Sequence, residues 1–329
     1  MKAEKSTRVF APTARNLVLL ARRLQAGELV AAPTETVYGL AANAFDAKAC
    51  RRIFTAKRRP ATDPLIVHLF SAAQLPDVCV PNEAARRLAA AFWPGPLTIV
   101  LPRTAAIPDV VTGGRDSVAV RMPAHRLFRR LLKLAGVPLA APSANPFGYV
   151  SPTTAGHVHE GLGRRIGYIL DGGPTPIGLE STIVDLRDER HPRLLRPGAV
   201  TRADLERVLK RPVAAAKPAR AAGNTAQVAP GMLKRHYSPH TPIELHERLR
   251  ARESAKEAFV FFRRPMGGRH AANIFWLDPR GDVRAAGRRL FALLRQLDRA
   301  GYARLHVELA PGDGLAEAIN DRLRRAAAR

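Results

Sequence analysis

The sequence has few cysteines, no apolar leader and no long hydrophobic run. Its 329 residues contain two cysteines, Cys50 and Cys79, too few for a disulfide framework or for zinc sites built from cysteine pairs. This usage is typical of a reducing compartment, so we expect a cytoplasmic protein. Residues 1–8 lead into no apolar signal region, and no run of about 18 apolar residues is present, so we expect no membrane segment.

Several common catalytic motifs are also absent. The sequence has no Gly-Lys-Ser or Gly-Lys-Thr phosphate loop, no dinucleotide fingerprint and no Gly-x-Ser-x-Gly nucleophile elbow. Its ten histidines form no zinc-protease or Cys/His pattern. Pro239 between His236 and His240 argues against a helical metal pair, and satisfied surface histidines are the simpler interpretation. We therefore predict no metal site made of protein ligands.

Positive charge is in large excess. Lys and Arg number 53 against 28 Asp and Glu, and the net charge of +25 favours an anionic partner such as a nucleotide or nucleic acid. The excess is spread along the chain as arginine doublets, so a compositional bias of the source explains it about as well. Hydrophobic residues make up 46%, which is enough for a buried core in one large or two smaller domains.

Helices and strands alternate over the first two hundred residues. Apolar periodicity predicts helices over 13–26, 46–56, 82–92, 125–136 and 201–210. Short apolar runs predict strands over 29–32, 65–69, 97–101, 117–121, 138–141 and 181–185. Ser151 is expected to cap a further helix, with Pro152 at its first position. We place the first domain at residues 12–210.

The character of the chain changes after this domain. Residues 211–240 begin without periodicity and are interpreted as a linker that becomes a lid. Residues 241–329 then predict a second, smaller domain with a parallel sheet. Its expected strands are 258–262, 274–277 and 305–309, and its expected helices are 280–298 and 314–327.

The stretch with the clearest chemistry is the basic segment 57–68. Lys57, Arg58 and Arg59 stand in a row, and Pro60 and Pro64 each disfavour helix for the residue before them. We expect these cations on a rigid loop at the entrance of a buried strand, where they would suit a polyphosphate. A solvated surface run is the alternative, because charge runs are usually solvated.

Small polar residues follow two of the strands, at 33–40 and 142–148. Such loops are typical ligand sites, with a plain polar turn as the alternative. Hydroxyl side chains, together with the cations, could bind a nucleoside triphosphate without a Walker loop. Nucleotidyl transfer needs mostly charge neutralisation and in-line positioning, so no protein nucleophile is required. The set is Lys57, Arg58, Arg59, Arg121 and Arg196 with Thr36, Ser143, Ser151 and Ser181.

A series of motifs resembles one family, the YrdC-like L-threonylcarbamoyladenylate synthases in their long, two-domain form. The resemblance extends over nearly the whole chain, in the same order. It implies an α/β fold with an N-terminal YrdC-like twisted mixed sheet and helices, followed by a smaller Rossmann-like parallel α/β domain. The matching segments are 33–40, 57–68, 93–98, 118–123, 141–145, 151–153, 180–185, 196–198 and 231–239.

The resemblance also implies a reaction. Threonine, bicarbonate and ATP would give threonylcarbamoyladenylate and pyrophosphate, with Mg²⁺ on the phosphates. The product would serve a downstream tRNA threonylcarbamoyl transferase machinery. A lid that excludes water would protect such a labile mixed anhydride.

Site residues follow from the same resemblance. Thr36, His68, Arg121 and Ser181 would contact threonine, with Arg121 on its carboxylate, and we favour a binding role for His68 over a general-base role. Lys57 and Arg59 would be the catalytic cations. The residues expected at ATP are Lys57, Arg59, Asp63, Ser117, Ala141, Ser143, Ser151, Arg196 and Tyr237, the last as part of a lid.

Asp63 departs from the family pattern, in which asparagine is expected. Its charge would weaken ATP binding or recruit the metal ion.

The sequence is also compatible with two other functions. One is an RNA binder that uses the basic surface, so we expect weak RNA binding in addition to the reaction. The other is a carbamoyl-transferring relative in metallocofactor maturation, which would need cysteine pairs that this sequence lacks.

Overall fold

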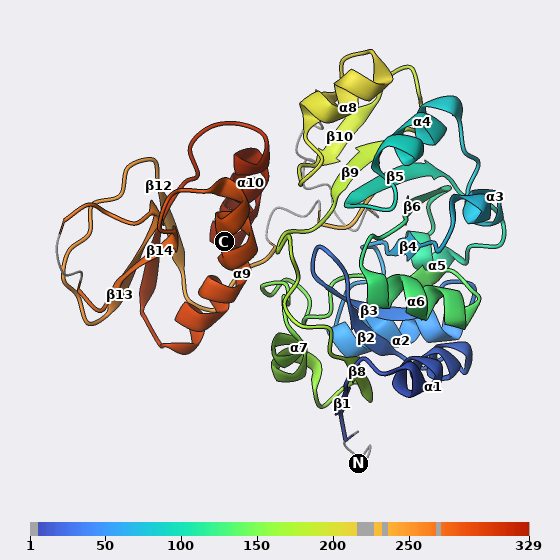
Figure 1. Ribbon diagram of the computed structural model, residues 1–329, viewed down its shortest axis with the longest axis horizontal. Helices are drawn as coiled ribbons and strands as arrows, with labels where there is room; N and C mark the ends of the chain where they lie inside the picture. Colours follow the sequence, from blue (N-terminus) through green and yellow to red (C-terminus); the bar gives the residue numbers. More distant parts are fainter. Residues whose placement is uncertain (1–5, 216–226, 232–235, 268–270, 329) are drawn as a thin grey trace.

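The computed structural model describes residues 6–215, 227–231, 236–267 and 271–328, which form two separate sheets (Figure 1). The larger sheet has eleven strands in the order β1-β8-β2-β3-β7-β4-β6-β5-β9-β10-β11, with parallel and antiparallel pairs. The smaller sheet has four strands in the order β12-β15-β13-β14, all parallel. The α/β fold with a mixed N-terminal sheet and a small parallel C-terminal sheet is therefore confirmed.

The larger sheet is built from short strands, and helices pack on it. Its strands are β1 (Arg8–Phe10), β2 (Val30–Pro33), β3 (Tyr38–Asn43), β4 (Ile66–His68), β5 (Leu97–Pro102), β6 (Ser117–Arg121), β7 (Leu139–Ala140), β8 (Tyr168–Leu170), β9 (Thr182–Asp185), β10 (Arg193–Arg196) and β11 (Ala214–Ala215). Its helices are α1 (Ala14–Gln25), α2 (Ala47–Lys57), α3 (Leu75–Val78), α4 (Glu83–Phe92), α5 (Asp109–Thr112), α6 (Arg126–Ala135), α7 (Ala155–Leu162) and α8 (Arg202–Leu209), with a 3₁₀ turn at Ala72–Gln74.

Apolar side chains of the helices and strands form separate core clusters. Helices α1 and α6 pack together through Leu17, Leu20, Phe128 and Leu131, all of them buried. Helices α2 and α4 contribute to a second cluster with the central strands. Because the central strands touch core on both sides, β4 and β6 are fully buried, and each is apolar except for polar residues at its ends.

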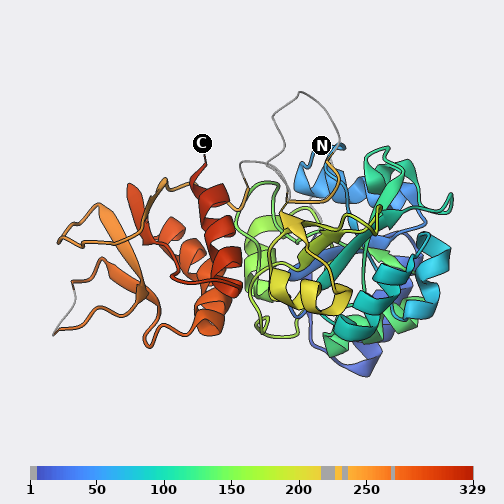
Figure 2. The same cartoon turned by 90° about the horizontal axis from the view of Figure 1, so that it is seen from above.

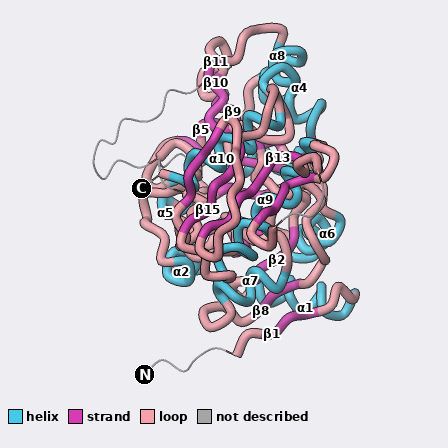
Figure 3. The backbone as a smooth tube through the Cα atoms, turned by 90° about the vertical axis from the view of Figure 1, so that its left-hand side faces the viewer, coloured by secondary structure: helices cyan, strands magenta, loops and turns pink. Residues whose placement is uncertain are grey.

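The C-terminal domain consists of β12 (Ile243–His246), β13 (Glu257–Arg263), β14 (Ile274–Asp278), α9 (Val283–Arg299), β15 (Arg304–Glu308) and α10 (Leu315–Ala327). Both helices lie between the small sheet and the N-terminal domain (Figures 1 and 2). The sheet therefore forms the side of the molecule away from that domain, which faces the viewer in Figure 3. Within the described ranges, no helix has the length and apolar character to cross a membrane.

Two local predictions are wrong. Helix α7 begins at Ala155 with Thr154 as its N-cap, so Ser151 caps no helix. Lys57 belongs to the last turn of α2, and Arg58 ends that helix in the left-handed conformation with φ of 54°, so the basic triplet straddles a helix end rather than standing on a loop. The predicted linker over 211–240 falls partly outside the described residues, since 216–226 and 232–235 are not described.

Candidate active site

The ends of two neighbouring strands bring an arginine and a histidine to one place. Strands β4 and β6 pair in parallel with His68 opposite Arg121, so both residues stand at the same edge of the sheet. Arg121 is held from several sides. Its Nη2 lies 2.7 Å from the Glu35 carboxylate, its Nη1 donates to Thr36 Oγ1 at 3.1 Å, and its Nε donates to the Gly95 carbonyl at 3.2 Å. The guanidinium is therefore buried but fixed in direction.

Glu35 and Thr36 come from the loop between β2 and β3. The loop closes on itself because Thr34 Oγ1 accepts the backbone N–H groups of Thr36 and Val37. Burial raises the pKa of Glu35, but the charge and hydrogen bond of Arg121 outweigh it, so its pKa lies below the ordinary value. Glu35 is thus a carboxylate at neutral pH, and it balances the charge of Arg121.

His68 is a neutral imidazole in this environment. Burial, and then the positive charge of Arg121, lower its pKa to about 3. Its Nδ1 is buried without a hydrogen-bond partner among the described residues, and its ring packs edge-on against Phe128 at a centroid distance of 5.3 Å. A buried nitrogen left without a partner in the ligand-free protein is a group that a ligand can satisfy.

The basic segment folds back on itself. Arg59 donates from Nε to the Asp63 carbonyl and from Nη2 to the Pro64 carbonyl, and its Nη2 lies 3.0 Å from the Asp63 carboxylate. Burial raises the pKa of Asp63 above its ordinary value, and the charges of Arg59, Lys57 and Arg196 offset only part of this rise. Asp63 is therefore the counter-charge of Arg59 and meets three cations.

Lys57 forms hydrogen bonds with the loop after β7. Its ammonium donates to the carbonyls of Ser143 and Asn145, and its side chain is fully buried. Burial and the charge of Arg59 lower the pKa of Lys57 well below its ordinary value. Lys57 thereby connects the end of α2 with the loop after β7, which carries Ser143.

A second arginine group stands on β9 and β10. Ser181 Oγ is within 2.8 Å of Thr98 Oγ1 and accepts from Arg196 Nη2 at 3.1 Å. Arg196 also donates to the Ser181 carbonyl and to the carbonyl of Pro230. Burial lowers the pKa of Arg196, which is fully enclosed.

Arg196 is covered by residues near the end of the predicted linker, 211–240. Tyr237 is 1% exposed, and Gly231 lies against both it and Arg196. A Cβ at Gly231 would stand 2.7 Å from the Tyr237 hydroxyl and 3.1 Å from Arg196 Nη1, and Gly231 has φ of +76°. Only glycine meets both conditions without strain. Tyr237 itself has φ of 62°, which is uncommon for a residue with a side chain.

One cavity joins these groups. It brings together nine of the predicted site residues and adds Thr34, Glu180 and His236, which the sequence analysis did not assign a role. The nine are Thr36, Arg59, His68, Arg121, Ala141, Ser143, Ser181, Arg196 and Tyr237.

Four predicted site residues do not line this cavity. Lys57 and Asp63 touch its walls through Ser143 and Arg59. Ser151 donates its hydroxyl to the Glu180 carboxylate, so it acts on the cavity through Glu180. Ser117 is buried on β6, and its hydroxyl has no hydrogen-bond partner among the described residues.

The comparisons with known proteins decide the family. A family model described as telomere recombination matches residues 22–198, and a model described as the C-terminal domain of threonylcarbamoyl-AMP synthase matches residues 200–328. A threonylcarbamoyl-AMP synthase of Pyrococcus abyssi is 44% identical over 92% of this chain and 91% of its own length. The chain belongs to the threonylcarbamoyl-AMP synthase family.

Other relatives agree along the whole chain. The threonylcarbamoyl-AMP synthase of Bacillus subtilis is 39% identical over 92% of this chain and 90% of its own length. The crystal structure of P. abyssi Sua5 complexed with L-threonine superposes with a TM-score of 0.89, at 38% identity and with 98% of each chain covered. Escherichia coli YciO, at 21% identity and a TM-score of 0.52, shares the fold over 58% of this chain. The predicted family is confirmed, as is its long two-domain form.

Three residues in or beside the cavity were not predicted from the sequence. Glu35 and Glu180 stand beside assigned residues within recognised motifs, so their positions were a usable signal. Arg322, on α10, contacts Glu180 across the domain boundary and belongs to no motif. A contact between residues so far apart in the chain has no local sequence signature.

Proposed function

We propose that this chain joins L-threonine, bicarbonate and ATP into L-threonylcarbamoyladenylate and pyrophosphate, as a nucleotidyltransferase. The supporting observation is the single cavity that links the Arg121 group with the Arg59 and Arg196 groups. An amino acid carboxylate and a polyphosphate both need cations, and the two ends of the cavity supply them separately. The Thr36 hydroxyl accepts a hydrogen bond from Arg121, and the Ser181 hydroxyl accepts one from Arg196.

The threonine end uses Arg121. A guanidinium pairs with a carboxylate through two parallel N–H donors. Glu35, Thr36 and the Gly95 carbonyl already fix the direction of that fork, so little freedom is lost on binding. The depressed pKa of His68 makes it a weak base near neutral pH, which supports binding rather than proton abstraction.

The phosphate end uses Arg59 and Arg196. The threonine amine attacks the carbon of bicarbonate, and water leaves as the N-carboxylate forms. Alternatively, bicarbonate takes up a proton and dissociates into CO₂ and water, and the amine adds to CO₂ and releases a proton. An oxygen of that carboxylate then attacks the α-phosphorus of ATP as the bond to pyrophosphate breaks. Negative charge builds on the phosphate oxygens, where fixed guanidinium groups stabilise it in a site that excludes water. Tyr237 covers Arg196 and helps to exclude water.

Mg²⁺ is proposed to arrive with ATP. Mg²⁺ keeps oxygen ligands and is usually held by substrate phosphates with one or two carboxylates. Glu180 lines the cavity, and Glu35 and Asp63 lie behind its walls; each of the three carboxylates is already paired with an arginine. The donors present therefore fit an ion held mainly by the phosphates, whose charge it would offset.

We further propose a cytoplasmic setting and a downstream partner. Cys50 and Cys79 are buried, unpaired thiols, which suits a reducing compartment. A mixed anhydride hydrolyses readily, so a threonylcarbamoyl-transferring machinery acting on tRNA should consume it. Direct RNA contact remains a prediction that rests on the net charge of +25.

Pyrophosphate release tests the proposed function. The purified chain is incubated with ATP, Mg²⁺ and bicarbonate, with threonine present or omitted. Threonine-dependent release, lost in Arg59→Ala and in Arg121→Ala, is the expected result. The control is Arg126→Ala. Arg126 is exposed and lies five residues after Arg121, the last residue of β6, so this variant should behave as wild type. Release that ignores threonine, or that survives both site variants, would refute the proposal.

A further inference from the structure

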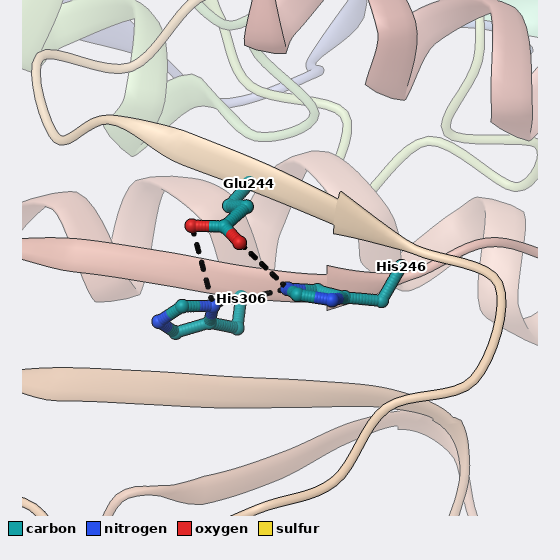
Figure 4. A group of neighbouring side chains, drawn as sticks. All are labelled: Glu244, His246 and His306. Atoms are coloured by element: carbon teal, nitrogen blue, oxygen red, sulfur yellow. Dashed lines mark hydrogen bonds and ion pairs between the residues drawn. The ribbon is translucent and has the colours of Figure 1, made fainter.

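Three side chains that could ligate a metal gather on the small sheet, far from the cavity. Strands β12 and β15 pair in parallel with Glu244 directly opposite His306. His246 is two residues after Glu244, so it points to the same side of the sheet. Figure 4 shows the Glu244 carboxylate and the two imidazoles turned toward one another.

Their spacing fits a tetrahedral ion. His246 Nε2 lies 3.0 Å from His306 Nδ1 and 3.7 Å from Glu244 Oε1, and His306 Nδ1 lies 3.9 Å from Glu244 Oε2. Zinc holds nitrogen and oxygen ligands at about 2.0–2.2 Å in a tetrahedron, so neighbouring ligand atoms lie about 3.4 Å apart. The observed distances bracket this value, although they involve both oxygens of Glu244. With one ligand atom taken from each side chain, the three atoms lie within 4.8 Å of one another. The side chains would therefore close in on an ion to form three corners of a tetrahedron.

His306 is held in place by its neighbours. Its ring stacks on Phe259 at a centroid distance of 4.8 Å with an interplanar angle of 10°. Its second nitrogen, Nε2, is buried, has no hydrogen-bond partner within the part of the chain that the structure describes, and faces Glu257 Oε1 at 3.7 Å. A metal-bound histidine commonly directs its other nitrogen to a carboxylate, which fixes the ring and makes it a better ligand. Glu257 stands where such a carboxylate is needed.

The charges near the cluster are compatible with a cation. Arg304 donates to Glu244 Oε2 at 2.7 Å and leaves Oε1 for a metal. Metal ligands must be deprotonated to bind, and carboxylates at the protein surface are ordinarily ionised at neutral pH. The guanidinium of Arg304 is partly exposed and is free to turn toward solvent.

A hydrogen bond between the two histidines is the competing explanation. At 3.0 Å, one neutral imidazole can donate its N–H to the bare nitrogen of the other. A metal ion would take the place of that proton. This explanation leaves unexplained why Glu244 and Glu257 flank the two sides of His306, as a ligand and its supporting carboxylate would.

We propose that Glu244, His246 and His306 form a binding site for Zn²⁺ or a similar transition-metal ion, with the fourth position open to water. Imidazole ligands favour zinc over magnesium or calcium, which prefer oxygen, so this site is separate from the Mg²⁺ that accompanies ATP. The ion would link β12 to β15 and stabilise the small sheet. The sequence predicted no metal site, because His246 and His306 are 60 residues apart in the chain.

Titration of the full chain with Zn²⁺ tests this site. We expect one ion bound per chain by calorimetry, and a rise in thermal midpoint with Zn²⁺ but not with an equal concentration of Mg²⁺. Cobalt(II) in the same site should give the strong visible absorption of a tetrahedral complex. His246→Ala and Glu244→Gln should each weaken binding at least tenfold and abolish the rise. Both residues are partly exposed, so these variants should fold.

The control is His159→Ala, which removes an exposed histidine from the N-terminal domain. This variant should bind Zn²⁺ as the wild type does. Circular dichroism and threonine-dependent pyrophosphate release of the metal-free variants should match the wild type, because no residue of the cluster touches the cavity. Absence of stoichiometric Zn²⁺ binding by the wild-type chain would overturn the proposal, as would binding that His246→Ala and Glu244→Gln leave unchanged.

Discussion

Arg322 Nε lies 2.9 Å from Glu180 Oε2, although the two residues are 142 positions apart and belong to different domains. Both side chains are almost fully enclosed, at 0% and 7% exposure. Glu180 lines the cavity and accepts a hydrogen bond from Ser151, while the Arg322 guanidinium lies over the Tyr237 ring at 5.4 Å. Helix α10 therefore contacts both Glu180, in the wall of the active site, and Tyr237, which covers it.

The first prediction concerns this ion pair. Arg322→Met should lower the free energy of unfolding by about 3–5 kcal/mol, because it leaves the Glu180 carboxylate buried without its partner. The same variant should reduce kcat/KM for ATP at least tenfold, since Tyr237 loses a neighbour. Urea denaturation and steady-state pyrophosphate release measure the two effects.

Two further variants separate charge from packing. Arg322→Met combined with Glu180→Gln removes both charges and should regain part of the lost stability. Arg324→Met, on the exposed face of the same helix, should cost little of either property. An Arg322→Met protein as active and as stable as the Arg324→Met control would show that the domain contact has no role in the site.

The sequence predicted most of the fold for a clear physical reason. Caps and apolar spacing are local signals. The helices predicted over 46–56, 82–92 and 201–210 are confirmed, and Asp46, Asn82 and Thr201 are their N-caps. Strands β1, β3, β8, β11 and β12 were missed. Strands β1, β8, β11 and β12 are only two to four residues long, and the places of β1, β8 and β12 are set by pairing with a distant strand. The six-residue β3 was missed because its first residues belong to the segment 33–40, which was predicted as a polar loop.

The site followed the same division. Arg121 and His68 were identifiable because motifs carry them, and the pairing of β4 with β6 explains why they meet. The Ser151 cap was wrong because Ser151 Oγ donates to Glu180 instead of capping a helix, a partner that is 29 residues away. The role of Arg322 could not be predicted, since neither its spacing nor its neighbours in the sequence indicate it.

The second prediction concerns threonine binding. Arg121→Lys keeps the positive charge but loses the planar fork that Glu35 and Thr36 hold in direction. Charge-assisted hydrogen bonds contribute about 1.5–3 kcal/mol, so kcat/KM for threonine should fall by a factor of about ten to one hundred. The KM for ATP should change less than about threefold, because Arg59 and Arg196 are untouched. Equal losses for both substrates would mean that Arg121 does not discriminate between them.

The third prediction concerns the counter-charge of Arg59. Asp63→Asn removes a carboxylate 3.0 Å from Arg59 Nη2 and leaves the backbone acceptors of that arginine in place. The guanidinium then has more charge to offer a phosphate, so the KM for ATP should fall several-fold while the KM for threonine stays constant. The control is Asp77→Asn, at an exposed position. An ATP dependence identical to the wild type would show that Asp63 does not compete with the nucleotide.

The fourth prediction concerns acid stability. Burial and the charge of Arg121 lower the pKa of His68 to about 3 in the folded protein, from an ordinary value of 6.5. Below pH 6.5 the unfolded chain binds a proton at this residue and the folded chain does not. The stabilisation is therefore complete above pH 6.5 and decreases by about 1.4 kcal/mol per pH unit as the pH falls toward 3.

His68→Gln removes this proton linkage. Between pH 7 and pH 5, its free energy of unfolding should fall by about 2 kcal/mol less than that of the wild type. Other buried histidines, such as His236, lose stability in acid in both proteins, so the difference between the two isolates His68. Urea denaturation at the two pH values gives the comparison, with exposed His159→Gln as the control. Parallel losses in wild type and variant would mean that His68 is protonated in the folded protein at pH 5, and its neutral binding role would then fail.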